Sequence, residues 1–324
     1  MLTNETLWHG KPYYSLDAYC KNTYHEKLYK IALDAGMTCP NRDGTLDTRG
    51  CIFCSEGGSG DFAVRSHPVR PMKDQIAEGL SLFREKKTGS RFIAYFQAYT
   101  NTYAPLSYLR AIYTEALEEP CIAGISIATR PDCITEGVLS LLARLRHQYP
   151  DKFIWVELGL QTIHEETAAF IRRGYPLSVF DAALSKLNAI GIPVVVHLIL
   201  GLPGETDQQI LQSVSYLNDR PVFGVKLQLL HVLKNTDLAE YYAQGKFEAL
   251  TKEHYIRLLL SSIGCLSPDI VIHRLTGDGP KEQVIAPLFS LNKRDVLNTF
   301  HQECRQKSIW QGKFLHDTGT IDFI

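Results

Sequence analysis

The chain has 324 residues, of which 45% are apolar and 21% are charged, and its formal net charge is −1. This composition is that of a globular protein and excludes a disordered chain, while the near-zero charge removes any argument from bulk charge for nucleic-acid binding. The length is enough for one large α/β domain with additions or for two ordinary domains.

The N-terminal segment has no basic start followed by an apolar run, so we expect no signal peptide. No part of the chain approaches the ~18 uninterrupted apolar residues of a membrane span, and we expect a cytoplasmic protein with reduced cysteines. Between residues 10 and 30, five tyrosines are interleaved with four lysines. This mixture fits a surface that stacks bases and binds phosphates, and it fits equally a tyrosine-rich helix packed on the rest of the chain.

An apolar run at 29–35 predicts the first strand, and the loop CPNRDGTLDTRGCIFC that follows it carries Cys39, Cys51 and Cys54. Three soft thiolates on one loop can hold an iron–sulfur cluster and leave one iron open for a substrate or cofactor. The alternatives are a structural zinc completed by His25 or His67, or three unrelated buried cysteines. The remaining cysteines are isolated, and we expect them to pack in the core: Cys20, Cys121, Cys133, Cys265 and Cys304.

Strand-like apolar runs alternate with amphipathic runs from here to residue 262. We predict strands at 91–98, 121–128, 152–160, 192–200 and 222–230, and helices at 71–87, 105–119, 135–147, 164–190 with a break at 174–176, 206–218 and 235–262. Continuous apolar strands such as IPVVVHLIL are typical of a parallel sheet that is buried on both faces. Six strand–helix repeats therefore indicate an α/β fold whose parallel sheet is wound into an open or closed barrel. We expect residues 263–324 to lie outside the repeats, as a lid or an edge addition.

In a barrel of this kind, functional residues lie at the carboxyl ends of the strands. Every predicted strand carries polar residues near that end: besides the cysteine loop, they are Gln97, Tyr99, Thr100, Arg130, Glu157, Gln161, His197, Lys226, Gln228, His231 and Lys234. A single buried Gln or His is usually a satisfied core group, but polar residues at all six ends need many hydrogen-bond partners. A polar ligand in the mouth of the barrel would supply those partners.

The three-cysteine loop after the first strand of a six-strand barrel resembles the radical S-adenosylmethionine (SAM) superfamily. The 11 residues between Cys39 and Cys51 are more than the common spacing and resemble the branch that contains the catalytic subunit of Elongator. Over residues 10–290 the motifs resemble, in the same order, the bacterial YtqA/YhcC group of that branch: ALDAGMTCPNRDGT, GCIFCSEGGSGDF, FQAYTNTY, SIATRPDC, ELGLQT, RRGY, HLILGLPGET and KLQLLHVLKNTDLA.

The resemblance implies a partial (βα)6 TIM-like barrel at 28–262, with an N-terminal extension at 1–27 and a C-terminal extension at 263–324. It also implies two cofactors, a four-iron four-sulfur cluster and SAM. Cys39, Cys51 and Cys54 would each bind one iron, and the amino and carboxylate groups of SAM would chelate the fourth. Reductive cleavage of SAM then yields a 5′-deoxyadenosyl radical that removes a hydrogen atom from the substrate.

Further contacts to SAM are implied by position in the family's pattern. Phe53 would shield the cluster, Gln161 and Arg173 would contact the methionine part, and His197 would face the ribose, with Arg172 as a neighbouring candidate for the carboxylate. Gln97, Tyr99 and Thr100 replace the superfamily's usual Gly-Gly-Glu stretch, so Gln97 or Thr100 would meet the cofactor amine. Arg130 would pair with the cofactor carboxylate or with Asp132, and Gly201 would begin the loop against the adenine.

For the substrate, the resemblance implies the wobble uridine of tRNA, with a 5-carboxymethylaminomethyl side chain converted to 5-aminomethyl. The implied partners are the tRNA anticodon loop and a reducing electron donor such as flavodoxin or ferredoxin. Lys226 and His231, in the KLQLLHVLKNT block, would bind the substrate; alternatively Lys226 pairs with a core acid such as Glu157.

Two other functions remain open from the sequence. The chain could be a radical SAM enzyme that acts on a small molecule, or a zinc-stabilised RNA-binding protein without catalysis. Anaerobic purification separates the second of these, because an iron–sulfur protein is brown and a zinc protein is colourless.

Overall fold

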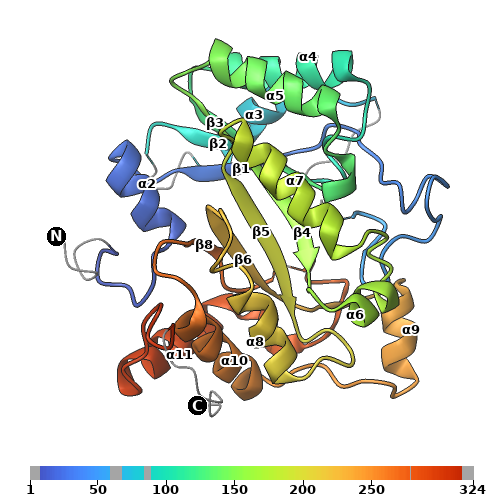
Figure 1. Cartoon of the computed structure of the whole chain (residues 1–324), viewed down its shortest axis with the longest axis vertical. Coiled ribbons are helices and arrows are strands. Elements are labelled where there is room, and N and C mark those ends of the chain that lie inside the picture. Colours follow the sequence, from blue (N-terminus) through green and yellow to red (C-terminus); the bar gives the residue numbers. More distant parts are fainter. Residues whose placement is uncertain (1–7, 59–67, 84–88, 278, 316–324) are drawn as a thin grey trace.

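The structure of the chain is a computed structural model that describes residues 8–58, 68–83, 89–277 and 279–315. Seven parallel strands form one curled sheet, open between its two edge strands β1 and β8 (Figure 1). In order across the sheet the strands are β1 (Tyr29–Leu33), β2 (Phe92–Phe96), β3 (Ile122–Thr129), β4 (Phe153–Gln161), β5 (Val194–Leu200), β6 (Gly224–Leu229) and β8 (Val271–Arg274).

The first six strands confirm the predicted parallel half barrel, and each lies within its predicted range to about one residue. The seventh strand, β8, was missed and comes from the C-terminal extension, where it pairs in parallel with β6. Its four residues VIHR are too short and too polar to produce the apolar run that marked the other strands. Residues 263–324 thus add a strand to the edge of the sheet.

Helices surround the sheet. They are α3 (Met72–Ser81), α4 (Leu106–Glu118), α5 (Glu136–Gln148), α6 (Glu165–Phe170), α7 (Leu177–Ala189), α8 (Asp207–Ser215), α9 (Asp237–Ala243), α10 (Lys252–Cys265) and α11 (Lys293–Gln306), with short 3₁₀ turns η1 (Pro131–Cys133) and η2 (Leu288–Leu291). Of these, α3, α4, α5, α7 and α8 pack on the strands of the sheet, as expected for parallel strands with apolar side chains on both faces. The predicted break at 174–176 separates α6 from α7. The single helix predicted at 235–262 is two helices, because Gly245 adopts φ +67° just after α9. Two short strands, β7 (Val232–Leu233) and β9 (Val284–Ala286), form a separate antiparallel sheet.

The helix α2 (Leu16–Tyr24) packs against the amino ends of the strands, on the side of the molecule away from the cysteine loop (Figure 1). The ring of Tyr19 lies edge-on to Phe223 with centroids 4.9 Å apart, and it also contacts Trp155. The ring of Tyr24 packs on Phe153 at 5.3 Å. The prediction of a base-stacking surface here was therefore wrong, and the alternative of a packed tyrosine-rich helix is confirmed. Tyr19 and Tyr24 instead pack against the apolar cluster at the bottom of the barrel.

The N-terminal segment also covers the free edge of β8. The backbone N–H of Ile272 donates to the carbonyl of Tyr14 at 2.7 Å, and Ser15 bridges to Ile272 in parallel. An open strand edge is a site for unwanted pairing, so this cover protects the sheet. Among the described residues, no helix is both long and apolar enough to cross a membrane.

Candidate active site at the carboxyl ends of the strands

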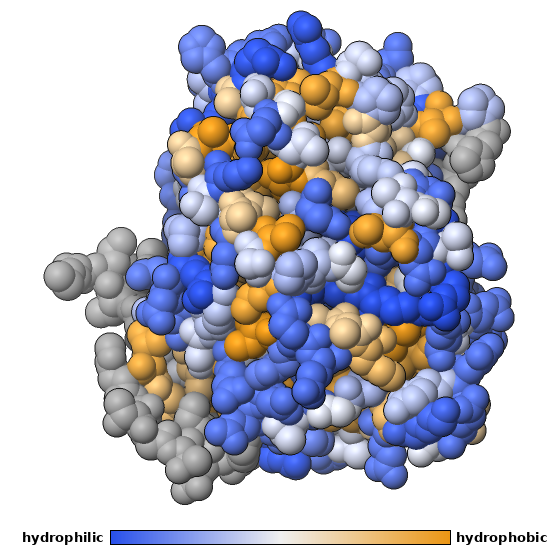
Figure 2. All heavy atoms as spheres, turned by 45° about the vertical axis from the view of Figure 1, so that its right-hand side comes forward, coloured by the Kyte–Doolittle hydropathy of each residue, from blue (hydrophilic) through white to orange (hydrophobic). Residues whose placement is uncertain are grey.

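A cavity of about 250 Å³ opens at the carboxyl ends of the strands. Its walls bring together almost all the residues that the sequence predicted for the site: Cys39, Cys51, Phe53, Cys54, Gln97, Thr100, Arg130, Gln161, Arg173, His197, Lys226 and His231. Gly201 was also predicted for the site, but it is not among the described residues that line the cavity. It lies next to Leu250 instead: a Cβ atom at Gly201 would be 2.7 Å from this side chain. The face turned forward in Figure 2 carries a band of strongly hydrophilic side chains with apolar side chains above and below it.

The cysteine loop folds back on itself, so the long spacing between Cys39 and Cys51 closes in space. The carbonyl of Cys39 accepts from the backbone N–H groups of Arg42 and Asp43, at 2.8 and 3.1 Å. The guanidinium of Arg42 then reaches across the loop and donates to the carbonyls of Cys54 and Ser55, at 2.8 and 2.6 Å. These contacts hold the three cysteines around one end of the cavity.

The three sulfurs form a donor set suited to iron and sulfide. Burial and then the nearby Cys54 raise the pKa of Cys51 to about 12, Cys39 adds to the shift, and Arg130 opposes it. A free thiol here would stay protonated, and only a bound metal would make it a thiolate. Within the described parts of the chain, no three Cys, His, Asp or Glu side chains converge on a single metal ion. His25 caps the end of α2 far from this loop, and His67 lies outside the described residues.

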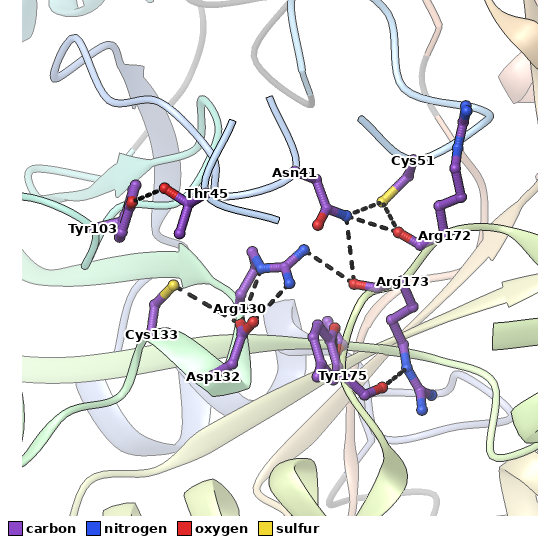
Figure 3. A network of polar contacts seen from close by, with 11 residues as sticks. Asn41, Thr45, Cys51, Tyr103, Arg130, Asp132, Cys133, Arg172, Arg173 and Tyr175 are labelled. Carbon is purple, nitrogen blue, oxygen red and sulfur yellow. Dashed lines mark hydrogen bonds and ion pairs between the residues drawn. The ribbon is translucent and has the colours of Figure 1, made fainter. Parts of the chain in front are cut away.

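The turn after α6 supports the cysteine loop from below (Figure 3). Asn41 donates to the carbonyl of Arg172 at 2.7 Å, and the side chain of Arg172 pairs with Asp237 at 2.5 Å. Leu238 donates its backbone N–H to the carbonyl of Ile52 at 2.9 Å, so α9 closes over the loop. The position of the cysteines thus depends on both α6 and α9.

Arg173 reaches the wall of the cavity with its donors largely occupied. Its guanidinium donates to the carbonyls of Tyr175, Leu160 and Thr162 at 2.9, 3.1 and 2.6 Å, and to Glu165 at 3.2 Å. This buried arginine therefore fixes the backbone around the site with four of its five N–H donors.

The sequence left two partners open for Arg130, the cofactor carboxylate and Asp132, and in the structure Arg130 pairs with Asp132. It forms a two-pronged ion pair with Asp132, at 2.9 and 2.7 Å, and donates to the carbonyl of Arg173 at 3.0 Å (Figure 3). The ring of Tyr175 lies under both guanidinium groups, 4.9 Å from Arg130 and 5.0 Å from Arg173. The two arginines and Tyr175 thus form one stacked wall of the cavity.

Residues with unusual backbone angles gather around this cavity. Tyr99 and Gln161 line it with φ of +58° and +67°, and Arg172 follows α6 with φ of +56°. Side chains other than glycine rarely adopt this left-handed region, and such strain is concentrated at functional sites. Gln161 also has a buried Oε1 atom without a hydrogen-bond partner. A buried acceptor without a donor among the described residues is costly, so this oxygen is a position where a donor from a ligand would be stabilising.

A buried ionic network closes the floor of the cavity around Glu157. This carboxylate accepts from Lys30 at 2.6 Å and Ser126 at 2.6 Å through one oxygen, and from His197 at 2.7 Å and Lys226 through the other. Lys226 also donates to the hydroxyl of Tyr95 at 2.9 Å. The expected alternative that Lys226 pairs with Glu157 is confirmed, yet Lys226 still lines the cavity. Burial lowers the pKa of Lys226 well below its ordinary value, and the neighbouring Glu157 opposes this shift. As an ammonium, Lys226 has three donors, and two of them have partners among the described residues.

The charges in this network are set by their neighbours. Burial alone would raise the pKa of Glu157, but Lys226 and Lys30 outweigh it and lower the pKa well below its ordinary value. Burial, followed by Lys226, lowers the pKa of His197 from 6.5 to about 4, against the opposing effect of Glu157. At neutral pH the floor therefore holds an ionised Glu157 and a neutral His197 that donates a hydrogen bond to it.

The shift at His197 predicts a pH dependence of stability. The unfolded chain binds a proton to this residue near pH 6.5 and the folded chain near pH 4, so stability falls as the pH is lowered between these values. We expect wild type to lose about 2 kcal/mol of unfolding free energy from pH 7 to pH 5 through this residue, at about 1.4 kcal/mol per pKa unit. Glu157 contributes in the same direction but only below its ordinary pKa of 4.5, outside this window.

Urea unfolding at pH 7, 6 and 5 measures this contribution when wild type is compared with His197→Gln. The variant should show a flatter dependence on pH. Equal slopes for the two proteins would contradict the assignment of a neutral, buried His197.

Sequence reasoning missed Lys30 and Tyr95 as members of the site. The sequence signal that could have indicated such residues is the alternation of side chains along a strand, which puts every second residue on the same face. The cavity-lining residues follow this spacing in the pairs Tyr95 and Gln97, Glu157 and Gly159, and Lys226 and Gln228. Once one inward position is known on each strand, the others follow at even spacing. His231 is an odd number of residues from Lys226 and so does not follow this alternation. It can still line the same cavity because β6 ends at Leu229, before His231.

Comparison with known proteins adds to this geometry. A profile of the radical SAM superfamily matches residues 48–217, and a profile of the radical SAM C-terminal domain matches residues 222–306. The Bacillus subtilis (strain 168) protein YtqA is 40% identical over 304 residues, which cover 94% of this chain and 93% of YtqA. A tRNA uridine(34) acetyltransferase of Methanocaldococcus jannaschii is 26% identical over 192 residues, which cover 58% of this chain and 34% of that protein.

A solved structure shares the fold. The archaeal Methanocaldococcus infernus Elp3 with an N-terminal deletion superposes with a TM-score of 0.65 at 15% identity, over 90% of this chain and 68% of that one. The half barrel of seven parallel strands is therefore an arrangement common to the two proteins.

Proposed function

The chain belongs to the radical SAM superfamily, and from this we propose that it is an enzyme that binds a four-iron four-sulfur cluster and SAM and modifies a wobble uridine of tRNA in the cytoplasm. The proposed reaction converts the 5-carboxymethylaminomethyl side chain of this uridine to 5-aminomethyl. The methylene group next to the carboxylate would lose a hydrogen atom to the 5′-deoxyadenosyl radical and one electron to the oxidised cluster, which gives an imine. Water would then hydrolyse the C=N bond, so that the two carbons leave as glyoxylate and the amine stays on the uridine. One observation carries the proposal: three cysteines and a buried lysine line one cavity, where a cofactor and an anionic substrate group could meet.

The residues present fit the two cofactors. Cys39, Cys51 and Cys54 would hold the cluster by three of its irons, and the unpartnered Oε1 of Gln161 would accept a hydrogen bond from the amino group of SAM. When bound, the cluster and SAM together supply a carbon radical that removes a hydrogen atom from the substrate. A reducing partner such as flavodoxin or ferredoxin would provide the electron.

The chain's own residues shape what such a radical can reach. Phe53, Ile171, Ile199, Leu229 and Leu230 give the cavity an apolar lining that keeps water from a reactive intermediate. At the floor, the third donor of Lys226 would bind the substrate carboxylate, with His231 beside it in the same wall. A carboxylate bound there would place the adjoining methylene group towards the cofactor end of the cavity.

The relatives support tRNA as the substrate. The Methanocaldococcus jannaschii relative is named for uridine 34 of tRNA, and the Elongator-like branch is implied to act at the same nucleotide. An anticodon loop presents unpaired bases that can leave the stack and enter a pocket. The cavity would accept one such base with its C5 side chain pointing to Lys226.

A reconstituted assay tests this proposal. The enzyme is loaded anaerobically with iron and sulfide, then incubated with SAM, dithionite and tRNA that carries 5-carboxymethylaminomethyluridine. Mass spectrometry of the digested nucleosides should show loss of this nucleoside and a matching gain of 5-aminomethyluridine. SAM cleavage that leaves every tRNA nucleoside unchanged would reject the tRNA substrate, and the absence of any SAM cleavage would reject the enzyme assignment.

A further inference from the structure

Asn41 is buried at 2% exposure inside the cysteine loop, where its side chain joins three parts of the site. Its Nδ2 atom lies 2.7 Å from the carbonyl oxygen of Arg172, 3.5 Å from that of Arg173 and 3.6 Å from the sulfur of Cys51 (Figure 3). Its own backbone carbonyl accepts from the N–H of Gly50 at 2.7 Å, next to Cys51. The amide therefore lies between a metal-ligand sulfur and the turn that supports it.

The surrounding backbone fixes the orientation of this amide. Gly174 adopts φ +83°, and a Cβ atom at this position would lie 2.8 Å from the Oδ1 atom of Asn41. Only a glycine leaves room for the amide oxygen here, so the Nδ2 atom is directed to the other side, towards Arg172 and Cys51. An amide nitrogen has two hydrogens. One satisfies the carbonyl of Arg172, and the other is left for the sulfur or the carbonyl of Arg173.

Loss of the thiol proton makes the sulfur depend on this donor. As a thiol, Cys51 can donate to the carbonyl of Arg172 at 3.5 Å. As a thiolate bound to iron, Cys51 has no proton to donate. Its negative sulfur then faces the partly negative carbonyl oxygen of Arg172, and the two atoms repel each other. The Asn41 N–H lies near both atoms, so it can offset this repulsion by donating to the negative sulfur.

We propose that Asn41 is a positioning residue that donates an N–H···S hydrogen bond to Cys51 when this cysteine ligates the cluster, and that this bond raises the cluster's reduction potential. Hydrogen bonds to ligand sulfurs are one of the means by which a protein sets this potential, because they favour the more negative reduced state. The inference rests on the proposed function for the presence of the cluster, but it does not depend on the substrate.

The test is a reductive titration of the cluster-loaded protein, followed by electron paramagnetic resonance. Asn41→Leu and Asn41→Ala both remove the donor, the first with similar volume and the second without risk of overpacking. Both variants should bind iron and show a midpoint potential more negative than that of wild type. The matched control is Asn188→Leu, which removes an amide bonded to the carbonyl of Leu184 in α7, away from the loop. Its midpoint should equal that of wild type.

The outcomes separate this inference from the proposed function. Midpoints of Asn41→Leu and Asn41→Ala that equal the wild-type value overturn it, even if the variants hold less iron, because a purely structural role would lower loading without shifting the potential. If Asn41→Leu does not fold, Asn41→Ala decides alone. A wild-type protein that forms no cluster overturns both the proposed function and this inference.

Discussion

Replacement of any one of Cys39, Cys51 and Cys54 by alanine is expected to abolish formation of 5′-deoxyadenosine from SAM while leaving the fold largely intact. Each cysteine would bind a different iron, so two remaining ligands cannot hold the cluster in the orientation that SAM requires. The side chains are small and only partly buried, so truncation should cost no more than about 1 kcal/mol of stability.

Chromatography of the products after incubation with dithionite measures 5′-deoxyadenosine, and iron analysis with far-ultraviolet circular dichroism reports loading and fold. Cys121→Ala is the matched control: Cys121 is also a partly exposed free cysteine, but it precedes β3 and lies outside the cavity wall. It should keep the wild-type rate. Continued production of 5′-deoxyadenosine by the triple variant would show that these cysteines do not carry the cluster.

Lys226→Met is expected to reduce substrate turnover by about a hundredfold while SAM cleavage without substrate persists. The variant keeps the length of the side chain but removes the donor that would bind the substrate carboxylate. Loss of one partner from a buried, hydrogen-bonded charge pair costs about 2–5 kcal/mol, which sets the size of the effect. His231→Ala should act in the same direction, because His231 lines the same cavity.

Lys226 also balances Glu157, so its loss could lower stability as well as activity. The double variant Lys226→Met with Glu157→Gln removes both charges of this pair but also the carboxylate that pairs with Lys30 at 2.6 Å, so it should recover stability only in part and turnover not at all. Lys234→Met, at an exposed lysine of the same segment, is the control that should retain both. Equal loss of turnover and of uncoupled SAM cleavage would place Lys226 at the cofactor, and loss of neither would leave it a structural residue.

The six main strands could be predicted from the sequence because their apolar runs are long and continuous. The cysteine loop could be predicted as one site because its three cysteines share a single connection between a strand and a helix. The same reasoning failed for β8, whose four residues are held in the sheet by pairing with β6 and by the N-terminal segment. Its position is decided by tertiary contacts, which no local pattern records.

The roles of charged residues were harder to predict than their location. Arg173 was expected at the cofactor carboxylate, and its place in the cavity wall agrees, but its donors are taken by backbone carbonyls that only the folded chain brings together. Likewise, the segment near the N-terminus has the composition of a nucleic-acid surface, but its Tyr19 packs against Trp155 and Phe223 and its Tyr24 against Phe153. Composition indicates which interactions a segment can make, and packing decides which of them it makes.

The measurement that tests the account most directly is mass spectrometry of tRNA nucleosides from a strain that lacks this chain. The strain should accumulate 5-carboxymethylaminomethyluridine at the wobble position and lose the 5-aminomethyl form. Expression of the wild-type chain should restore the 5-aminomethyl form, and expression of Cys54→Ala should not. Unchanged wobble nucleosides in the deletion strain would contradict the proposed reaction.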